Sequence, residues 1–78
     1  PKEDTEMHIR ECFLAAYEYG LDLFKKEYCD GFNVGQNVGE AAGQTVMWPH
    51  VHMIPRLNGD CADPRGGVRG VIPEKQKY

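Results

Sequence analysis

The chain has 78 residues, a formal net charge of -3 and 9 Lys and Arg residues that are scattered rather than grouped. Sequence-independent binding to nucleic acid needs a basic stripe that displaces counterions from phosphates, so nucleic acid is not expected as a main partner. A domain of this size buries only about 60% of the surface that its unfolded chain exposes. We therefore expect a partner to complete its core.

The cysteines and the distribution of apolar residues bear on the cellular compartment. Cys12, Cys29 and Cys61 are odd in number and widely spaced, which disfavours a disulfide framework or a CxxC zinc site. The sequence has no long apolar run of the length that spans a membrane, and no basic start followed by an apolar stretch. These features predict a reduced, cytoplasmic protein without a membrane partner or a signal peptide.

Residues 4–28 are predicted to form one amphipathic helix, because apolar and small residues recur at intervals of three and four. These residues are Ile9, Cys12, Phe13, Ala16, Gly20, Leu23 and Phe24. A glycine inside a helix costs about 1 kcal/mol relative to alanine. Gly20 therefore indicates close packing against another element.

Residues 31–56 are predicted to form a hairpin, with strands over 31–37 and 45–56 joined by a small, polar stretch over 38–43. A two-stranded hairpin is marginal in water, so further strands are expected from another segment or another chain. The tail, residues 57–78, is punctuated by turn residues and is expected to wrap over another surface. Its apolar anchors would be Val68, Val71 and Ile72.

Two histidines, His50 and His52, lie two residues apart in an otherwise apolar run. Side chains at i and i+2 of a strand share a face, about 6.6 Å apart along the strand, so both imidazoles could address one ligand. The spacing also fits two strand histidines bonded to their neighbours. A zinc site that adds Cys61 or Cys29 is a further alternative, since imidazole and thiolate suit zinc.

The motif Asn37-Val-Gly-Glu-Ala-Ala-Gly-Gln-Thr-Val46, followed by His50-Val-His-Met-Ile-Pro-Arg56, resembles the histidine triad (HIT) family of nucleotide hydrolases and transferases. The similarity continues through Gly59-Asp60 and through 63–67. The resemblance implies an α+β, HIT-like fold, in which one long helix packs on an antiparallel hairpin with an extended C-terminal tail. Residues 1–78 would be a single partial domain that lacks the family's N-terminal helix and strands.

Aligned on the Ile-Pro-Arg ending, His50 takes the middle place of the triad, His52 takes the last, and Trp48 replaces the first histidine. The resemblance implies that His50 attacks phosphorus while the Trp48 carbonyl holds the proton on Nδ1. It also implies a phosphate-binding shell of Asn37, Gly43, Gln44, Thr45 and His52, and a scheme that requires no metal or other cofactor. Gln44 and Thr45 could instead be turn residues before a strand, and Asn37 could form an Asx turn.

The predicted function is hydrolysis or transfer at the α-phosphate of a nucleotide, in a dinucleoside polyphosphate or a nucleotide phosphoramidate, through a covalent nucleotidyl-His50 intermediate. Such chemistry divides one difficult displacement into two easier ones. The alternative is a non-catalytic nucleotide-binding or regulatory module, which the replacement of the first triad histidine by Trp48 favours. The expected partners are a nucleotide substrate and a second copy of the chain in a homodimer.

Overall fold

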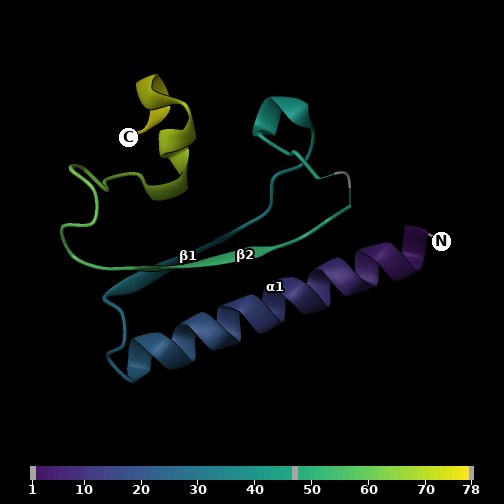
Figure 1. Cartoon of the computed structure of the whole chain (residues 1–78), viewed down its shortest axis with the longest axis horizontal. Coiled ribbons are helices and arrows are strands. Elements are labelled where there is room, and N and C mark those ends of the chain that lie inside the picture. Colours follow the sequence, from purple (N-terminus) through teal and green to yellow (C-terminus); the bar gives the residue numbers. More distant parts are fainter. Residues whose placement is uncertain (1, 47, 78) are drawn as a thin grey trace.

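The computed structural model describes residues 2–46 and 48–77 and shows an α+β arrangement, as expected. Its elements, in chain order, are α1 (Lys2–Lys25), β1 (Gly31–Gly35), η1 (Glu40–Ala42), β2 (His52–Arg56), η2 (Gly67–Val71) and η3 (Pro73–Lys75). The helix lies along one side of the two strands, whereas the η1 loop and the C-terminal turns rise on the other side (Figure 1). The sheet therefore forms the middle of three layers.

The helix ends earlier than the predicted boundary at residue 28, because the backbone turns left-handed at Glu27, where φ is 63°. The Tyr28 amide donates to the Leu23 carbonyl at 2.9 Å, and the Glu27 amide donates to the Phe24 carbonyl at 3.1 Å. This pair of bonds is a Schellman motif, which usually has glycine at the left-handed position. Because the residue at this position is a glutamate, the pattern of apolar residues did not indicate where the helix ends.

The sheet is an antiparallel pair whose register runs from Gly31 opposite Arg56 to Gly35 opposite His52. Both strands are shorter than predicted, since β1 ends before Gln36 and β2 begins only at His52. Residues 36–46 and 48–51 form a loop that hydrogen-bonds within itself, and Pro49 has no amide to contribute to a ladder. The prediction of a strand from residue 45 was therefore wrong.

Alternation along the paired strands gives the sheet two different faces. Phe32 and Pro55 are opposite one another on the face that meets α1, and the Phe32 ring lies 6.0 Å from the Tyr17 ring, centroid to centroid. Asn33 and Ile54 pair on the opposite face. That second face carries His52 as well, so it is the side of the sheet on which the site is built.

Close contact between α1 and β1 confirms the expected role of Gly20. A Cβ atom placed on Gly20 would overlap the Phe32 ring, with Cε2 only 2.6 Å away. Few side chains are enclosed by this packing: Cys29 is 4% exposed, whereas Leu14, Tyr19 and Tyr28 are 59%, 62% and 73% exposed. Much of the apolar surface of the described residues thus remains uncovered.

The tail is more ordered than the extended segment that was predicted. Residues 63–77, here called the C-terminal segment, fold into η2 and η3. The residues that were predicted to anchor the tail do not pack into a core, because Val68, Val71 and Ile72 are 61%, 84% and 48% exposed. Within the described part of the chain, no helix combines the length and the apolar character needed to cross a membrane.

The contact of Gly20 with Phe32 gives a first prediction. Gly20→Ala should lower the free energy of unfolding by about 1–3 kcal/mol, because overpacking outweighs the gain in helix propensity. In a Phe32→Ala background the same substitution should instead stabilise the protein by up to about 1 kcal/mol, since the obstructing ring is gone. Urea unfolding of the four proteins measures both effects. Equal effects of Gly20→Ala in the two backgrounds would contradict the contact.

Candidate functional site

Two glycines with positive φ angles shape the loop between the strands. Gly39 and Gly43 have φ values of 88° and 89° on either side of η1. The amide of Gly43 donates to Glu40 at 2.9 Å, and the amide of Gln44 returns to the Gly39 carbonyl at 3.1 Å. A Cβ on Gly43 would lie 3.9 Å from Asn37 Nδ2, so the structure brings these two predicted site residues together.

The Gln44 side chain spans the same loop. Its Oε1 accepts the Gly39 amide at 2.7 Å, and its Nε2 donates to the Val46 carbonyl at 2.9 Å. The side chain therefore stabilises the glycine-rich turn, in agreement with the alternative that Gln44 is a turn residue. Its Nε2 has a second N–H that these two bonds do not use. Thr45 is exposed and lies next to this brace.

The two motif histidines meet, although not in the way that strand geometry predicted. His52 opens β2, while His50 precedes the strand and is exposed. Their ring centroids are 4.8 Å apart and their planes are nearly perpendicular, at 87°. The prediction that both side chains project from one strand was wrong, but the rings form an edge-to-face pair.

The orientation of the His50 ring is fixed by the main chain. Its Nδ1 lies 3.1 Å from the Trp48 carbonyl oxygen. A carbonyl can only accept, so the proton of this bond is on Nδ1, and in the neutral ring Nε2 carries the lone pair. The contact that the family resemblance implies is therefore present with tryptophan in the first triad position.

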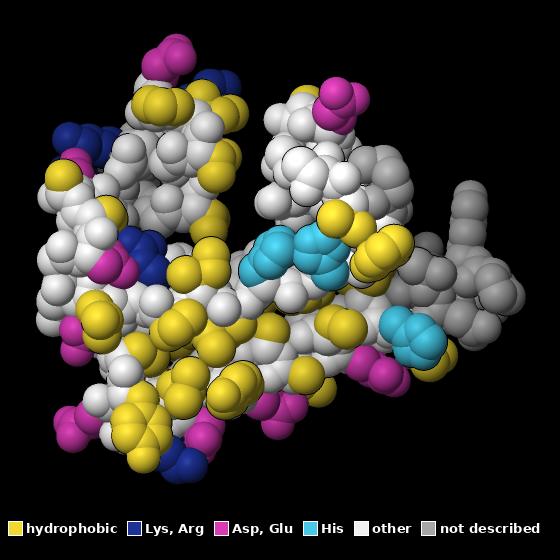
Figure 2. Space-filling model, viewed as in Figure 1, with side chains coloured by type: hydrophobic (Ala, Val, Ile, Leu, Met, Phe, Trp, Pro, Cys, Tyr) yellow, Lys and Arg dark blue, Asp and Glu magenta, His cyan; other side chains and the backbone are white. Residues whose placement is uncertain are grey.

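A groove of about 910 Å³ lies on the face of the sheet opposite α1, between the loop and the C-terminal segment. The loop contributes both polar and apolar residues to its lining, among them Asn37, Val38 and Gly43, and the C-terminal segment contributes Val68, Val71 and Ile72. Asn33, His52 and Ile54 of the sheet also line it. In Figure 2 the same space is a hollow flanked by two raised parts of the surface, with histidine rings beside its floor. Neither Gln44 nor Thr45 lines it.

His50 lines a different and smaller cavity, of about 240 Å³, on the side of the helix. That cavity also has His8 and Cys12 of α1 in its walls. The predicted site residues thus line two cavities: Asn37, Gly43 and His52 line the groove, and His50, whose ring centroid lies 4.8 Å from that of His52, lines the smaller one. The docking of α1 places His8 beside His50.

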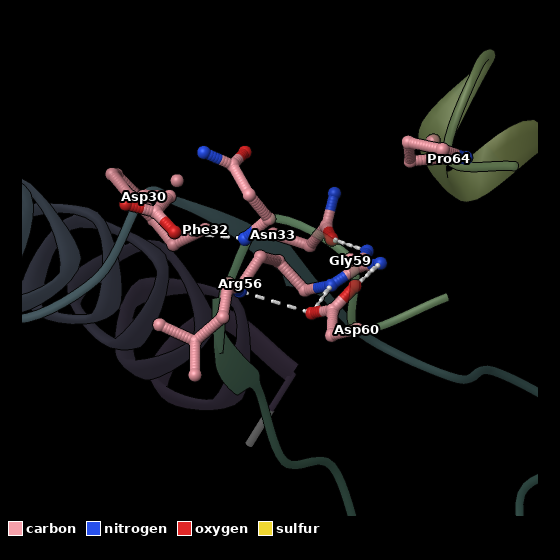
Figure 3. A pocket seen from close by; sticks show the side chains of 11 residues that line it. Asp30, Phe32, Asn33, Arg56, Gly59, Asp60 and Pro64 are labelled. Carbon is pink, nitrogen blue, oxygen red and sulfur yellow. Dashed lines mark hydrogen bonds and ion pairs between the residues drawn. The ribbon is translucent and has the colours of Figure 1, made fainter. Parts of the chain in front are cut away.

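The other end of the hairpin is held by Arg56, whose side chain joins both strands to the following turn (Figure 3). Its Nη1 donates to Asn33 Oδ1, and its Nε and Nη2 donate to the two carboxylate oxygens of Asp60, each at 2.7 Å. Nη2 also lies 3.1 Å from Cys61 Sγ. Asn33, Arg56 and Asp60 line a cavity of about 260 Å³. Arg56 is therefore engaged within the fold, as expected of an arginine that is not a phosphate ligand.

The Arg56–Asp60 pair shifts the pKa of both groups and favours the charged form of each. The hydrogen bonds from Arg56 and from the Leu57 amide hold the pKa of Asp60 well below its usual range. Hydrogen bonding to Asp60, and then to Cys61, raises the pKa of Arg56 further above its ordinary value. Sequence reasoning missed this cluster, although an Arg and an Asp four residues apart across Asn58-Gly59 were a visible signal.

Metal binding has no support in the arrangement of the side chains. Among residues 2–46 and 48–77, no three or more histidine, cysteine, aspartate or glutamate side chains are grouped so as to hold a metal ion. All three cysteines are free, and Cys29 is buried while Cys12 and Cys61 are exposed. The alternative of a zinc site built from His50, His52 and a cysteine is therefore not formed by the described residues.

Known proteins are similar to parts of the chain, and two of them show the extent of the similarity. An uncharacterized HIT-like protein of Methanocaldococcus jannaschii is 40% identical over 48 residues, which cover 62% of this chain and 37% of that protein. Adenylylsulfatase HINT3 of Arabidopsis thaliana is 44% identical over 39 residues, which cover 50% of this chain and 20% of that protein. These matches support a relation to the HIT family over a short stretch. No family model and no solved structure matches the chain.

The low pKa of Asp60 gives a prediction about acid stability. Because the folded-state pKa lies below the unfolded value of about 3.9, the ion pair stabilises the fold above that pH and is lost as the pH falls toward the folded value. Asp60→Asn should therefore unfold more easily at neutral pH, and its stability should fall less steeply than that of the wild type below about pH 4.

Denaturant unfolding at a series of pH values from neutral to strongly acidic measures this difference. Asp22→Asn is the matched control, because Asp22 forms an exposed i,i+4 pair with Lys26 at 3.0 Å. Exposed pairs of this kind contribute only about 0.3–0.5 kcal/mol. A slope for Asp60→Asn equal to that of the wild type would contradict the role of the pair.

Proposed function

We propose that this chain carries the phosphate-side part of a histidine triad site that hydrolyses or transfers a nucleoside monophosphate group. The observation that carries the proposal is the hydrogen bond from His50 Nδ1 to the Trp48 carbonyl, at 3.1 Å. It leaves Nε2 of the neutral ring as a nucleophile, while the exposed ring remains accessible to a substrate. The replacement of the first triad histidine by Trp48 leaves this main-chain contact intact.

The reaction proceeds in two displacements at phosphorus. The Nε2 lone pair of His50 forms an N–P bond while the bond from phosphorus to the leaving group breaks, and the leaving group takes its bonding electrons and a proton from water. A water molecule then attacks the nucleotidyl-His50 phosphorus, the N–P bond breaks, and the nucleoside monophosphate is released with the imidazole restored. When another acceptor replaces water, the same second step is a transfer.

Charge that develops on the phosphoryl oxygens requires fixed donors close by. Asn37 Nδ2 lies at the Gly43 turn, and His52 contacts the His50 ring from the floor of the groove. We assign these residues to the phosphate, together with the second N–H of the Gln44 amide and the Thr45 hydroxyl. The lack of a side chain at Gly43 allows a phosphate to approach the main chain closely.

The same proposal includes a nucleotide substrate of the dinucleoside polyphosphate or phosphoramidate type. The name of the Arabidopsis relative, adenylylsulfatase HINT3, supports a substrate with an activated nucleotidyl phosphate. The matched stretches span 37% and 20% of the two relatives, so the nucleoside pocket is assigned to protein beyond this chain. We place residues 1–78 in one HIT-like domain of a cytoplasmic protein.

A homodimer is part of the proposal because the packing is incomplete. The sheet formed by the described residues has two strands, and both of its outer edges are open. Leu14 and Tyr19 of α1 leave large apolar side chains 59% and 62% exposed. A second copy that pairs with an edge or covers the helix would remove this surface from water, which stabilises about 25 cal/mol per Å² buried.

A non-catalytic nucleotide-binding module is the second candidate function. The observation that favours it is the division of the site, in which His50 lines the helix-side cavity while Asn37, Gly43 and His52 line the groove. Asn37, Gly43 and His52 could bind a phosphate in the groove even if His50 does not react with it. Nucleotide binding would then serve recognition or regulation.

The first functional prediction concerns His50. In the protein that contains this chain, His50→Asn should lower kcat for hydrolysis of adenosine 5′-phosphoramidate by about 10³-fold or more, as removal of a covalent nucleophile does in other enzymes. The control is His8→Asn, which replaces the one histidine outside the His50-Val-His52 motif. Its kcat should stay within a few-fold of the wild-type value. Intact-mass spectrometry of rapidly quenched wild type should show one added nucleotidyl group, absent from His50→Asn.

Titration calorimetry with AMP separates the two candidate functions when it is read beside this assay. The enzyme proposal predicts that the wild type binds AMP and also turns over the phosphoramidate, with turnover dependent on His50. Saturable AMP binding with no turnover by the wild type would instead establish the binding module. Full activity of His50→Asn would remove this residue from the mechanism.

A further inference from the structure

Trp48 is the one tryptophan in the chain, and it is 71% exposed in the place of the first triad histidine. It lines neither the groove nor the cavity on the helix side. Neither of the ring contacts described above, Tyr17 with Phe32 and His50 with His52, involves it. A large aromatic side chain within the motif is thus left in contact with solvent.

The position of this side chain is tied to that of the nucleophile. The Trp48 carbonyl lies 3.1 Å from His50 Nδ1, so the main chain of residue 48 contacts the ring whose Nε2 attacks phosphorus in the proposed function. Consecutive Cα atoms are about 3.8 Å apart, so no more than about 7.6 Å separates the Cα atoms of Trp48 and His50. The indole therefore borders the place where a substrate phosphorus meets His50.

In-line displacement decides which part of a substrate lies beside this indole. The attacking and leaving atoms at phosphorus are roughly opposite one another, so the leaving group departs on the side away from His50. The nucleoside stays bonded to phosphorus through its 5′ oxygen during both displacements, and in the intermediate it is linked to His50 itself. A side chain next to His50 can therefore contact the nucleoside in both steps.

The part of a nucleoside that suits an exposed indole is the base. Aromatic side chains stack on nucleobases, and such stacking discriminates little between bases because every base has a π-face. Trp48 is largely exposed, so a base that stacks on it also removes apolar surface from water. Both effects favour a nucleotide over a phosphate ester that lacks a base.

We propose that Trp48 is a specificity-determining residue whose indole stacks on the base of the nucleotide that His50 attacks. This inference rests on the proposed function and adds one aromatic wall to the nucleoside pocket, whose other walls are assigned to protein beyond this chain. Trp48 then has two separate roles, because its carbonyl orients the imidazole and its side chain holds the base. A substitution changes the second role and leaves the carbonyl in place.

The test compares AMP with ribose 5-phosphate, which has the same phosphate and sugar without the base, by calorimetry on the protein that contains this chain. The base ratio is Kd for ribose 5-phosphate divided by Kd for AMP. Trp48→Leu should lower the base ratio by about tenfold, as expected for loss of one base–aromatic stack, and should leave Kd for ribose 5-phosphate within a few-fold. Trp48→Tyr keeps an aromatic ring and should retain most of the base ratio.

Tyr28→Leu is the matched control, because Tyr28 is 73% exposed and lies beyond the end of α1, in another part of the chain. It should keep the wild-type base ratio. A base ratio for Trp48→Leu equal to that of the wild type would overturn the stack. The stack is also overturned if Trp48→Leu weakens the binding of both ligands equally, since that result indicates a structural role.

Fluorescence provides a second measurement, which does not depend on the folding of Trp48→Leu. The emission of Trp48 is the difference between the spectra of the wild type and of Trp48→Phe. Saturating AMP should change this emission and protect it from quenching by acrylamide, whereas saturating ribose 5-phosphate should not. Emission that AMP leaves unchanged would contradict the inference.

Failure of the proposed function is distinguishable from failure of the stack. If adenosine 5′-phosphoramidate is not hydrolysed in a His50-dependent way, the enzyme proposal fails, and the binding comparison still decides the role of Trp48 because it needs no turnover. If hydrolysis depends on His50 but AMP and ribose 5-phosphate bind equally, the enzyme proposal stands and the stack is overturned. Absence of binding by both ligands overturns the stack as well.

Discussion

The register between β1 and β2 is the constraint on which the rest of the structure depends. Opposing Gly35 to His52 and Gly31 to Arg56 places Phe32 and Pro55 on the helix face. The same pairing places His52, Ile54 and Arg56 together on the other face, because side chains alternate along a strand. A shift by one residue would exchange the two faces and move the imidazole of His52 to the helix side.

The two ends of this pairing are held by different kinds of interaction. At the far end, the Arg56 guanidinium reaches Asn33 of β1 and both carboxylate oxygens of Asp60, so one planar cation joins two strands and a turn. On the helix side, the Phe32 ring fills the space left by Gly20. Polar contacts thus supply most of the specificity of the strand pairing on the site face, because few apolar side chains are enclosed there.

Incomplete enclosure and function are linked in this chain. The described residues enclose few side chains, and the apolar groups left outside fall in two places, along α1 and around the groove. The helix surface has the character of an interface that a second copy could cover. The groove differs because Asn33, Asn37 and His52 line it together with apolar side chains.

The sequence by itself determined the long helix, the hairpin with its glycine-rich loop, the close approach at Gly20 and the HIT-like motif, because periodicity, turn residues and short-range spacing are local properties. The resemblance to the HIT family also implied that the Trp48 carbonyl orients His50, and the hydrogen bond is present in the structure. The tertiary structure decided the features that depend on segments far apart in the chain. These are the docking of α1, which gives His50 and His8 one cavity, and the placement of the C-terminal segment along the groove. Helix docking and loop closure join residues tens of positions apart, and no local pattern in the sequence records such contacts.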